Sequence, residues 1–163
     1  MFIQRYFEKY ANVGAWRDGT IEQCRTLGYV ETLMGRRRYI PEIKSPNFQI
    51  RASGERMAIN MPVQGTASDI IKVAMNRIDE EITERGLRSR MILQVHDELI
   101  FEGPRAEIDA VREICLRLMS KSLDLVVPLK IDIKTGKNWG ELEVARGPLV
   151  SDAEAELEFA ETA

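Results

Sequence analysis

The chain has 163 residues and a formal net charge of −3, with 44% hydrophobic and 30% charged residues, values typical of one globular domain and not of a disordered chain. No uncharged apolar run approaches the roughly 20 residues of a membrane span, and early charges at Arg5, Glu8 and Lys9 predict that no signal peptide is present. Residues 1–60 have a formal net charge of +4 and residues 141–163 one of −6. Any nucleic-acid binding would therefore have to use a local basic region of the chain.

The cysteines and the histidine indicate the compartment. Cys24 and Cys115 lie far apart and form no CxxC motif, and His96 is the single histidine. These residues cannot supply a structural zinc site. The simple interpretation is a reducing, cytoplasmic setting, with no contact with a membrane.

The first third of the chain predicts two helices and a hairpin. Helical pattern covers residues 2–10 and 15–27, with Gly14 as the expected break and Gly28 as the helix end. Residues 29–34 and 36–40 are rich in β-branched and aromatic side chains and predict two strands, the second ending at Pro41.

Residues 48–85 form the longest helical pattern. An apolar stripe with helical period predicts its buried face: Ala67, Ile70, Ile71, Ala74, Ile78 and Ile82. Pro62 predicts a kink or a new helix start, because proline has no amide donor. Gly86 is the expected end.

Residues 91–95 and 99–101 are short apolar runs on either side of His96-Asp97-Glu98. Apolar side chains occur on both faces of each run, which predicts interior strands. A helix over 105–123, a strand over 125–133, a turn over 136–139 and an acidic, disordered tail over 144–163 complete the pattern. The order of these elements predicts an α+β fold with an antiparallel sheet.

The turn His96-Asp97-Glu98 is the most informative candidate site. Tight hairpins favour glycine, yet this connection holds two carboxylates and an imidazole. Carboxylates on such a turn suit a hard cation such as Mg²⁺, which takes one or two carboxylates together with phosphate oxygens. A solvated polar turn is the alternative, and the turn by itself does not decide between them.

Two further groups of residues are candidates for nucleic-acid contact. Arg56, Asn60 and Gln64 are spaced at i, i+4 and i+8, so they form one polar stripe on a continuous helix. Such side chains can contact minor-groove acceptors, sugars and phosphates, although a solvent-facing stripe has the same spacing. Arg36, Arg37 and Arg38, at the tip of the first hairpin, could bind phosphates, but surface arginine runs are common.

Three segments together resemble the C-terminal part of family A DNA polymerases, the bacterial polymerase I type. They are residues 28–33 with 35–39, residues 55–58 with 60–67, and residues 94–99, the last of which looks like the family's third polymerase motif. The resemblance runs collinearly from about residue 2 to residue 139, and the combination of motifs is highly specific. It implies an antiparallel palm sheet packed against long helices, in a partial polymerase palm domain.

The resemblance also implies roles. Asp97 looks like one of the two metal-binding catalytic aspartates, with Glu98 as its neighbour, and His96 resembles the residue that contacts the primer-terminal backbone. Arg56, Asn60 and Gln64 resemble palm residues that touch the primer–template minor groove, and Arg36, Arg37 and Arg38 would lie near the duplex. The implied reaction is attack of a primer 3′-hydroxyl on the α-phosphate of a deoxynucleoside triphosphate, with two Mg²⁺ ions.

The chain departs from the family pattern in what it lacks. It contains no Asp-Tyr-Ser-x-Ile-Glu motif for the second aspartate, no fingers helix for the incoming triphosphate, no thumb and no exonuclease domain. We therefore expect no polymerisation by this chain alone, and a separate N-terminal polymerase polypeptide as its partner. The alternative is a non-catalytic remnant that binds duplex DNA or another protein.

The expected organisation follows from the resemblance. Residues 1–143 form the palm region, divided into helices and a basic hairpin (1–47), long helices (48–86), the catalytic hairpin (91–103) and a helix with the last strand (104–139). Residues 144–163 form the tail. The expected location is the cytoplasm, in association with the nucleoid, and the pattern leaves replication or repair open.

Overall fold

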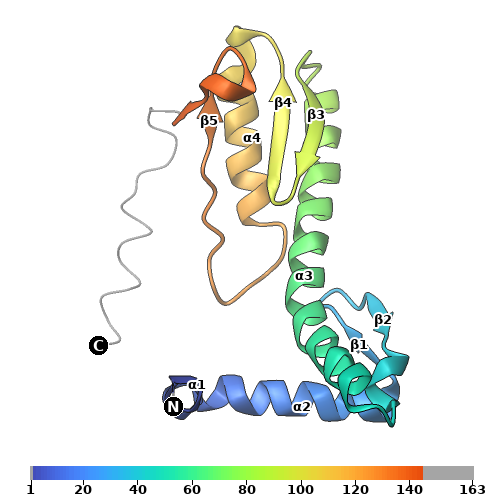
Figure 1. The fold of residues 1–163 in the computed structure, drawn as a ribbon. Helices are drawn as coiled ribbons and strands as arrows, with labels where there is room; N and C mark the ends of the chain where they lie inside the picture. The colour runs from blue at the N-terminus through green and yellow to red at the C-terminus, as the bar shows by residue number, and fades with distance from the viewer. Residues whose placement is uncertain (1, 145–163) are drawn as a thin grey trace. The chain divides into compact units, whose positions relative to one another are not determined.

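A computed structural model of the chain describes residues 2–144, with side chains from residue 5 onward. The chain divides into two compact units, which we describe separately. The first unit takes the chain up to Val73 together with His96–Glu98, and the second unit takes the rest. The architecture is mixed, with helices and small antiparallel sheets, as predicted (Figure 1). No helix in the described part of the chain has both the length and the apolarity needed to cross a membrane.

The first unit begins with helices and a hairpin. Its elements are α1 (Phe2–Lys9), α2 (Ala11–Leu27), β1 (Tyr29–Glu31), β2 (Arg37–Tyr39), the 3₁₀ helix η1 (Pro41–Lys44) and the first part of α3 (Phe48–Glu84). The expected break at Gly14 is wrong, because the helices separate at Tyr10 and Gly14 lies inside α2. A β-carbon at Gly14 would lie 3.5 Å from the Phe7 ring, an ordinary contact distance, so neither a turn nor a close approach requires glycine at this position.

Gly28 ends α2 as predicted. Its φ of 81° lies in the left-handed region, and its amide donates to the carbonyl of Cys24 at 2.8 Å. The chain then forms the predicted hairpin, with Tyr29 opposite Tyr39 and Glu31 opposite Arg37.

The core of the first unit joins α2, the hairpin, η1 and α3. Its buried members are Cys24, Val30, Ile40, Ile43 and Ala58. Gly54 lets α3 approach η1, since a β-carbon there would lie 2.8 Å from the Ile43 amide nitrogen. The hairpin and α3 are therefore in direct contact through apolar packing.

α3 is continuous over 37 residues. Asn47 caps its start, because the Asn47 side-chain oxygen accepts from the Gln49 amide at 2.9 Å. No new helix starts at Pro62, and the Pro62 carbonyl accepts from the Thr66 hydroxyl at 2.5 Å. The helix interior therefore tolerates the proline.

The second unit places a hairpin against two helices (Figure 1). The hairpin consists of β3 (Arg90–Val95) and β4 (Glu98–Glu102), and α4 (Ile108–Ser120) follows the 3₁₀ helix η2 (Arg105–Glu107). The core contains the end of the apolar stripe on α3 and two residues of α4: Ala74, Ile78, Ile82, Ile114 and Cys115. Burial raises the pKa of the Cys115 thiol to about 12, so this side chain packs as a small neutral group.

Two predictions about the strands are wrong. β3 and β4 form a two-stranded sheet within the described residues, with Ile92 55% and Leu93 45% exposed, so they are not interior strands. Residues 125–133 form no strand, although partly buried Leu129, Ile131 and Ile133 alternate with exposed side chains. Apolar faces and alternation show what a strand could bury, but pairing requires a neighbouring backbone.

The end of the described chain forms a small sheet. β5 (Lys134–Thr135) pairs antiparallel with β6 (Glu143–Val144), and the 3₁₀ helix η3 (Trp139–Glu141) lies between them. The expected tail lies outside the described residues except for Val144.

The close approach at Gly54 yields a stability prediction. Gly54→Ala should lower the free energy of unfolding by about 1–3 kcal/mol, because the added methyl meets the η1 backbone. The control is Gly19→Ala in α2, where a β-carbon meets nothing within 4 Å and should stabilise by about 0.5–1 kcal/mol. Urea unfolding of both variants measures the difference, and equal midpoints would contradict the packing.

Candidate functional site

The turn between β3 and β4 contains two residues, His96 and Asp97. His96 has φ of 54° and is the non-glycine residue with positive φ in the described chain. A side chain in this left-handed region costs about 1–3 kcal/mol, and such residues cluster at functional sites. Met91, Leu99 and Phe101 pack on the core of the second unit, so both strands leading to the turn are anchored.

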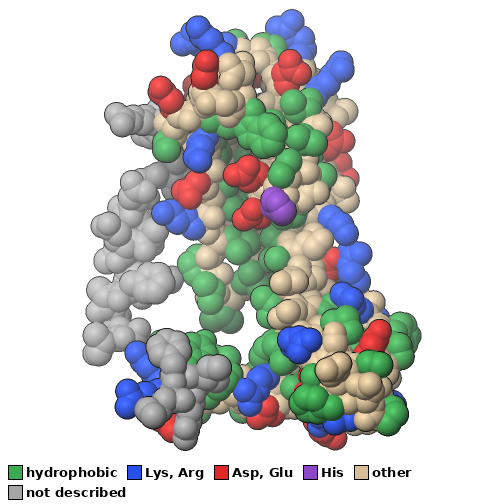
Figure 2. All heavy atoms as spheres, in the orientation of Figure 1, with side chains coloured by type: hydrophobic (Ala, Val, Ile, Leu, Met, Phe, Trp, Pro, Cys, Tyr) green, Lys and Arg blue, Asp and Glu red, His purple; other side chains and the backbone are tan. Residues whose placement is uncertain are grey.

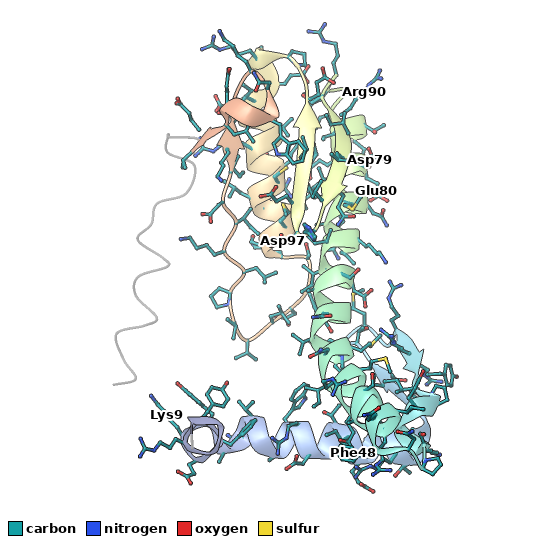
Figure 3. The ribbon with its side chains drawn as sticks, in the orientation of Figure 1. Lys9, Phe48, Asp79, Glu80, Arg90 and Asp97 are labelled. Atoms are coloured by element: carbon teal, nitrogen blue, oxygen red, sulfur yellow. The ribbon has the colours of Figure 1, made fainter. Side chains whose placement is uncertain are left out.

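The two turn residues and Glu98, the first residue of β4, are all exposed. Asp97 lies at the tip of the hairpin (Figure 3), and Figure 2 shows the histidine at the surface. The described residues contain no group of three histidine, cysteine or acidic side chains that could hold a metal ion. Asp97 and Glu98 are donors of the type that Mg²⁺ takes, but they fit only part of its shell.

The polar stripe on α3 lies at the surface. Arg56, Asn60 and Gln64 are all exposed, and they occupy one continuous helix in the same unit as the turn. Within residues 5–144 none of these three side chains has a hydrogen bond or an ion pair, so their polar groups are available to a ligand.

Arg36 is held by a buried carboxylate. Asp69 on α3 is only 3% exposed, and its Oδ1 accepts from Arg36 Nε at 2.7 Å and Nη2 at 2.5 Å. Asp69 Oδ2 accepts from the Thr32 hydroxyl at 2.7 Å. The Thr32 hydroxyl bond, and then the Arg36 guanidinium, hold the pKa of Asp69 below its ordinary value against the opposing effect of burial.

Two more contacts fix this loop on α3. The Leu33 amide donates to the Thr66 hydroxyl at 3.0 Å. A β-carbon at Gly65 would lie 2.7 Å from the Thr32 methyl, so the loop touches the helix backbone closely. We call Thr32, Arg36, Thr66 and Asp69 the hairpin anchor.

Arg37 and Arg38 point to opposite faces of the hairpin. Arg37 pairs with Glu31 at 2.5 Å and lies 4.7 Å over the Tyr29 ring. Arg38 lies opposite Val30, and its Nη2 is 3.4 Å from the Met57 sulfur on α3. Although the three arginines are consecutive residues of the same type, they therefore have three different environments.

The sequence did not single out Asp69. Its signal is its spacing, because residue 69 follows Ala58 by three helical turns and so shares the buried face of α3. An acidic residue on a buried helical face requires a cationic or hydrogen-bonding partner, and the nearby basic hairpin contains one.

Comparison with known proteins identifies the family. Residues 1–141 match the family described as DNA polymerase family A. The chain is 47% identical over 138 residues to DNA polymerase I of Bacillus subtilis and 46% identical over 138 residues to thermostable DNA polymerase I of Thermus thermophilus, in each case over 85% of this chain and 16% of the relative. A solved structure, the POL domain of Pol1 from M. smegmatis in complex with DNA primer-template and dNTP, matches with a TM-score of 0.76 and 44% identity, covering 78% of this chain and 23% of that one.

The mixed architecture of helices and small antiparallel sheets thus matches part of a polymerase domain. The chain belongs to DNA polymerase family A. It spans about one sixth of the length of the curated relatives that it matches.

The hairpin anchor yields a stability prediction. Asp69→Ala should lower the free energy of unfolding by about 1–3 kcal/mol, because the buried Thr32 hydroxyl and the Arg36 guanidinium lose their acceptor. Asp69→Asn should cost less, since its amide oxygen still accepts from Thr32. Asp79→Ala, an exposed aspartate on the same helix (Figure 3), should stay within about 0.5 kcal/mol. An Asp69→Ala variant as stable as Asp79→Ala would contradict the anchor.

Acid should weaken the fold by protonating Asp69 and other carboxylates whose pKa is lowered in the folded chain. Two other carboxyl groups behave like Asp69. A hydrogen bond from Ser89 lowers the pKa of Glu107, and a hydrogen bond from Arg117 lowers the pKa of Glu81. A lowered folded pKa gives stability that is present above the unfolded value of about 4 and is lost as pH falls. The urea concentration at the unfolding midpoint should therefore decrease as the pH is lowered below about 5. The decrease should be smaller in the Asp69→Asn variant than in the unchanged chain. An equal acid loss in that variant would contradict a role for Asp69.

Proposed function

We propose that this chain is the part of a DNA-directed DNA polymerase that supplies Asp97 to the reacting centre and the stripe on α3 to the primer–template. One observation carries the proposal. In a chain 44–47% identical to polymerase I sequences, an exposed carboxylate occupies a two-residue turn whose first residue has a strained backbone.

The strained turn supports a positional role for Asp97. Glycine at position 96 would remove the backbone cost, yet histidine is present with φ of 54°. Phosphoryl transfer depends mainly on positioning and on electrostatic stabilisation, so its carboxylates benefit from a short turn between paired strands. A solvated turn without function has no need of this geometry.

Asp97 would hold Mg²⁺, with Glu98 beside it, together with ligands from outside the described residues. When bound, Mg²⁺ neutralises phosphate charge and lowers the pKa of an attacking hydroxyl. His96 would hydrogen-bond the backbone of the primer terminus, and the anchored strands would hold all three side chains in place. Asp97 would thus keep its carboxylate directed at the reacting phosphates.

The stripe on α3 would contact the duplex. Arg56, Asn60 and Gln64 provide donors, and the amides of Asn60 and Gln64 provide acceptors too. Minor-groove contacts of this kind follow a duplex with little sequence discrimination. The basic hairpin that contains Arg36, Arg37 and Arg38 would lie near the same duplex.

The proposed activity requires more of the polymerase than this sequence contains. Asp97 and Glu98 would fill only part of a metal shell, because the described residues contain no group of three metal-binding side chains. We infer that the other catalytic ligands come from polymerase segments outside these 163 residues, in the same polypeptide or in a separate N-terminal one.

A chimaera tests this function. Residues 1–141 would replace the matching segment of the Bacillus subtilis relative, and primer extension would be measured with Mg²⁺ and deoxynucleoside triphosphates. Asp97→Asn should lower the extension rate by about 100-fold or more, because a charge that stabilises the reacting phosphates is lost. Glu102→Gln, at the other end of β4, should change the rate less than twofold.

Extension by the Asp97→Asn chimaera at the control rate would overturn the catalytic assignment. Mixing the 163-residue chain with a polymerase truncated before the matching segment tests whether the chain can supply Asp97 as a separate polypeptide. If the chimaera is inactive while the chain still binds primer–template duplex, the alternative of a non-catalytic duplex-binding module is favoured. The unpaired polar groups of the stripe on α3 are what support that alternative.

A further inference from the structure

The charges of the basic hairpin differ in how they are compensated. Arg36 is paired with Asp69 and Arg37 is paired with Glu31. Arg38 has no ion pair with any carboxylate of the described residues, and its one polar contact there is the Met57 sulfur at 3.4 Å. Sulfur is a weak acceptor and carries no charge, so no carboxylate of the described residues compensates the Arg38 guanidinium.

The register of the hairpin explains this difference. Residues directly opposite each other in an antiparallel pair have side chains on the same face. Glu31 lies opposite Arg37 and compensates it, whereas Val30 lies opposite Arg38 and enters the core. The face of Arg38 is thus the face that packs toward α3, where Met57 borders the same core.

The position of Met57 places the Arg38 charge beside the stripe. Asn60 follows Met57 by three residues and Gln64 follows it by seven, so both lie on nearly the same side of the helix as Met57. Arg56 is the residue before Met57 and also has no ion pair within the described chain. Two uncompensated guanidinium groups therefore border one row of amide side chains.

We propose that Arg38, and neither Arg36 nor Arg37, is the residue of the basic hairpin that binds a phosphate of the duplex lying along Arg56, Asn60 and Gln64. This inference rests on the proposed function, because it assumes that the stripe contacts duplex DNA. Arg36 is instead a positioning residue, since its contacts with Asp69 hold the hairpin on α3. Arg37 is occupied by Glu31 and by the Tyr29 ring.

Salt dependence of duplex binding tests this assignment. The whole chain would be titrated with a fluorescent primer–template duplex over a range of KCl concentrations. Each phosphate contact contributes about 0.9 to the slope of log K against log salt. Arg38→Ala should reduce the slope by about 0.9 and leave the urea midpoint unchanged, because the side chain is exposed. Arg38→Lys should restore the slope, because lysine keeps the charge.

Two controls separate a contact from a general change of charge. The double variant Glu31→Gln with Arg37→Ala removes the neighbouring pair, and Arg105→Ala removes one exposed charge in the second unit. Both should keep the slope of the unchanged chain. If either lowers it as much as Arg38→Ala does, the inference is overturned.

The remaining outcomes separate the inference from the proposed function. If Arg56→Ala lowers the slope while Arg38→Ala does not, the duplex contact of α3 stands and the role of Arg38 is overturned. If the unchanged chain does not bind the duplex at low salt, the duplex contact of α3 and the role of Arg38 are both overturned, while the chimaera assay still decides the role of Asp97. An Arg36→Ala variant with an unchanged urea midpoint would contradict its positioning role.

Discussion

The buried carboxylate of Asp69 is the interaction on which the arrangement of the first unit depends. Burying a charge is costly unless it is paired and hydrogen-bonded, and Asp69 has both a guanidinium and a hydroxyl partner. Those partners lie in the loop between β1 and β2, so the electrostatic requirement of one helical residue fixes the position of a hairpin. The basic hairpin therefore lies against α3, with Arg38 Nη2 3.4 Å from the Met57 sulfur.

The continuity of α3 is the second constraint. The helix contributes its first part to the core around Ala58 and its last part to the core around Ile78. Pro62 removes one backbone donor, yet helix formation continues because tertiary packing on both sides outweighs a local cost of about 3 kcal/mol. The exposed stripe of Arg56, Asn60 and Gln64 exists only because the helix is not interrupted there.

The turn between β3 and β4 combines stability and chemistry in a different way. Its strands are anchored by apolar packing, while its tip has an unfavourable backbone angle and exposed acidic side chains. Such a turn lowers the stability of the hairpin and is retained where a fixed side-chain position is needed. The role that we propose for Asp97 would account for that position, since phosphoryl transfer relies on carboxylates held before the substrate arrives.

The sequence by itself determined the local elements and the family. Periodicity and glycine positions predicted α2, the first hairpin, α3 and the core positions Ala74, Ile78 and Ile82, because these signals act within a few residues. It placed the break between α1 and α2 wrongly, because a glycine inside a helix costs only about 1 kcal/mol and α2 continues through Gly14.

Only the tertiary structure decided which charges compensate each other and which strands pair. Arg36, Arg37 and Arg38 are identical in sequence, and their different environments arise from Asp69, Glu31 and Met57, which come from elsewhere in the fold. Residues 125–133 have the alternation of a strand but do not pair, since a strand requires a backbone beside it. Both outcomes depend on contacts between residues far apart along the chain, which local patterns do not encode.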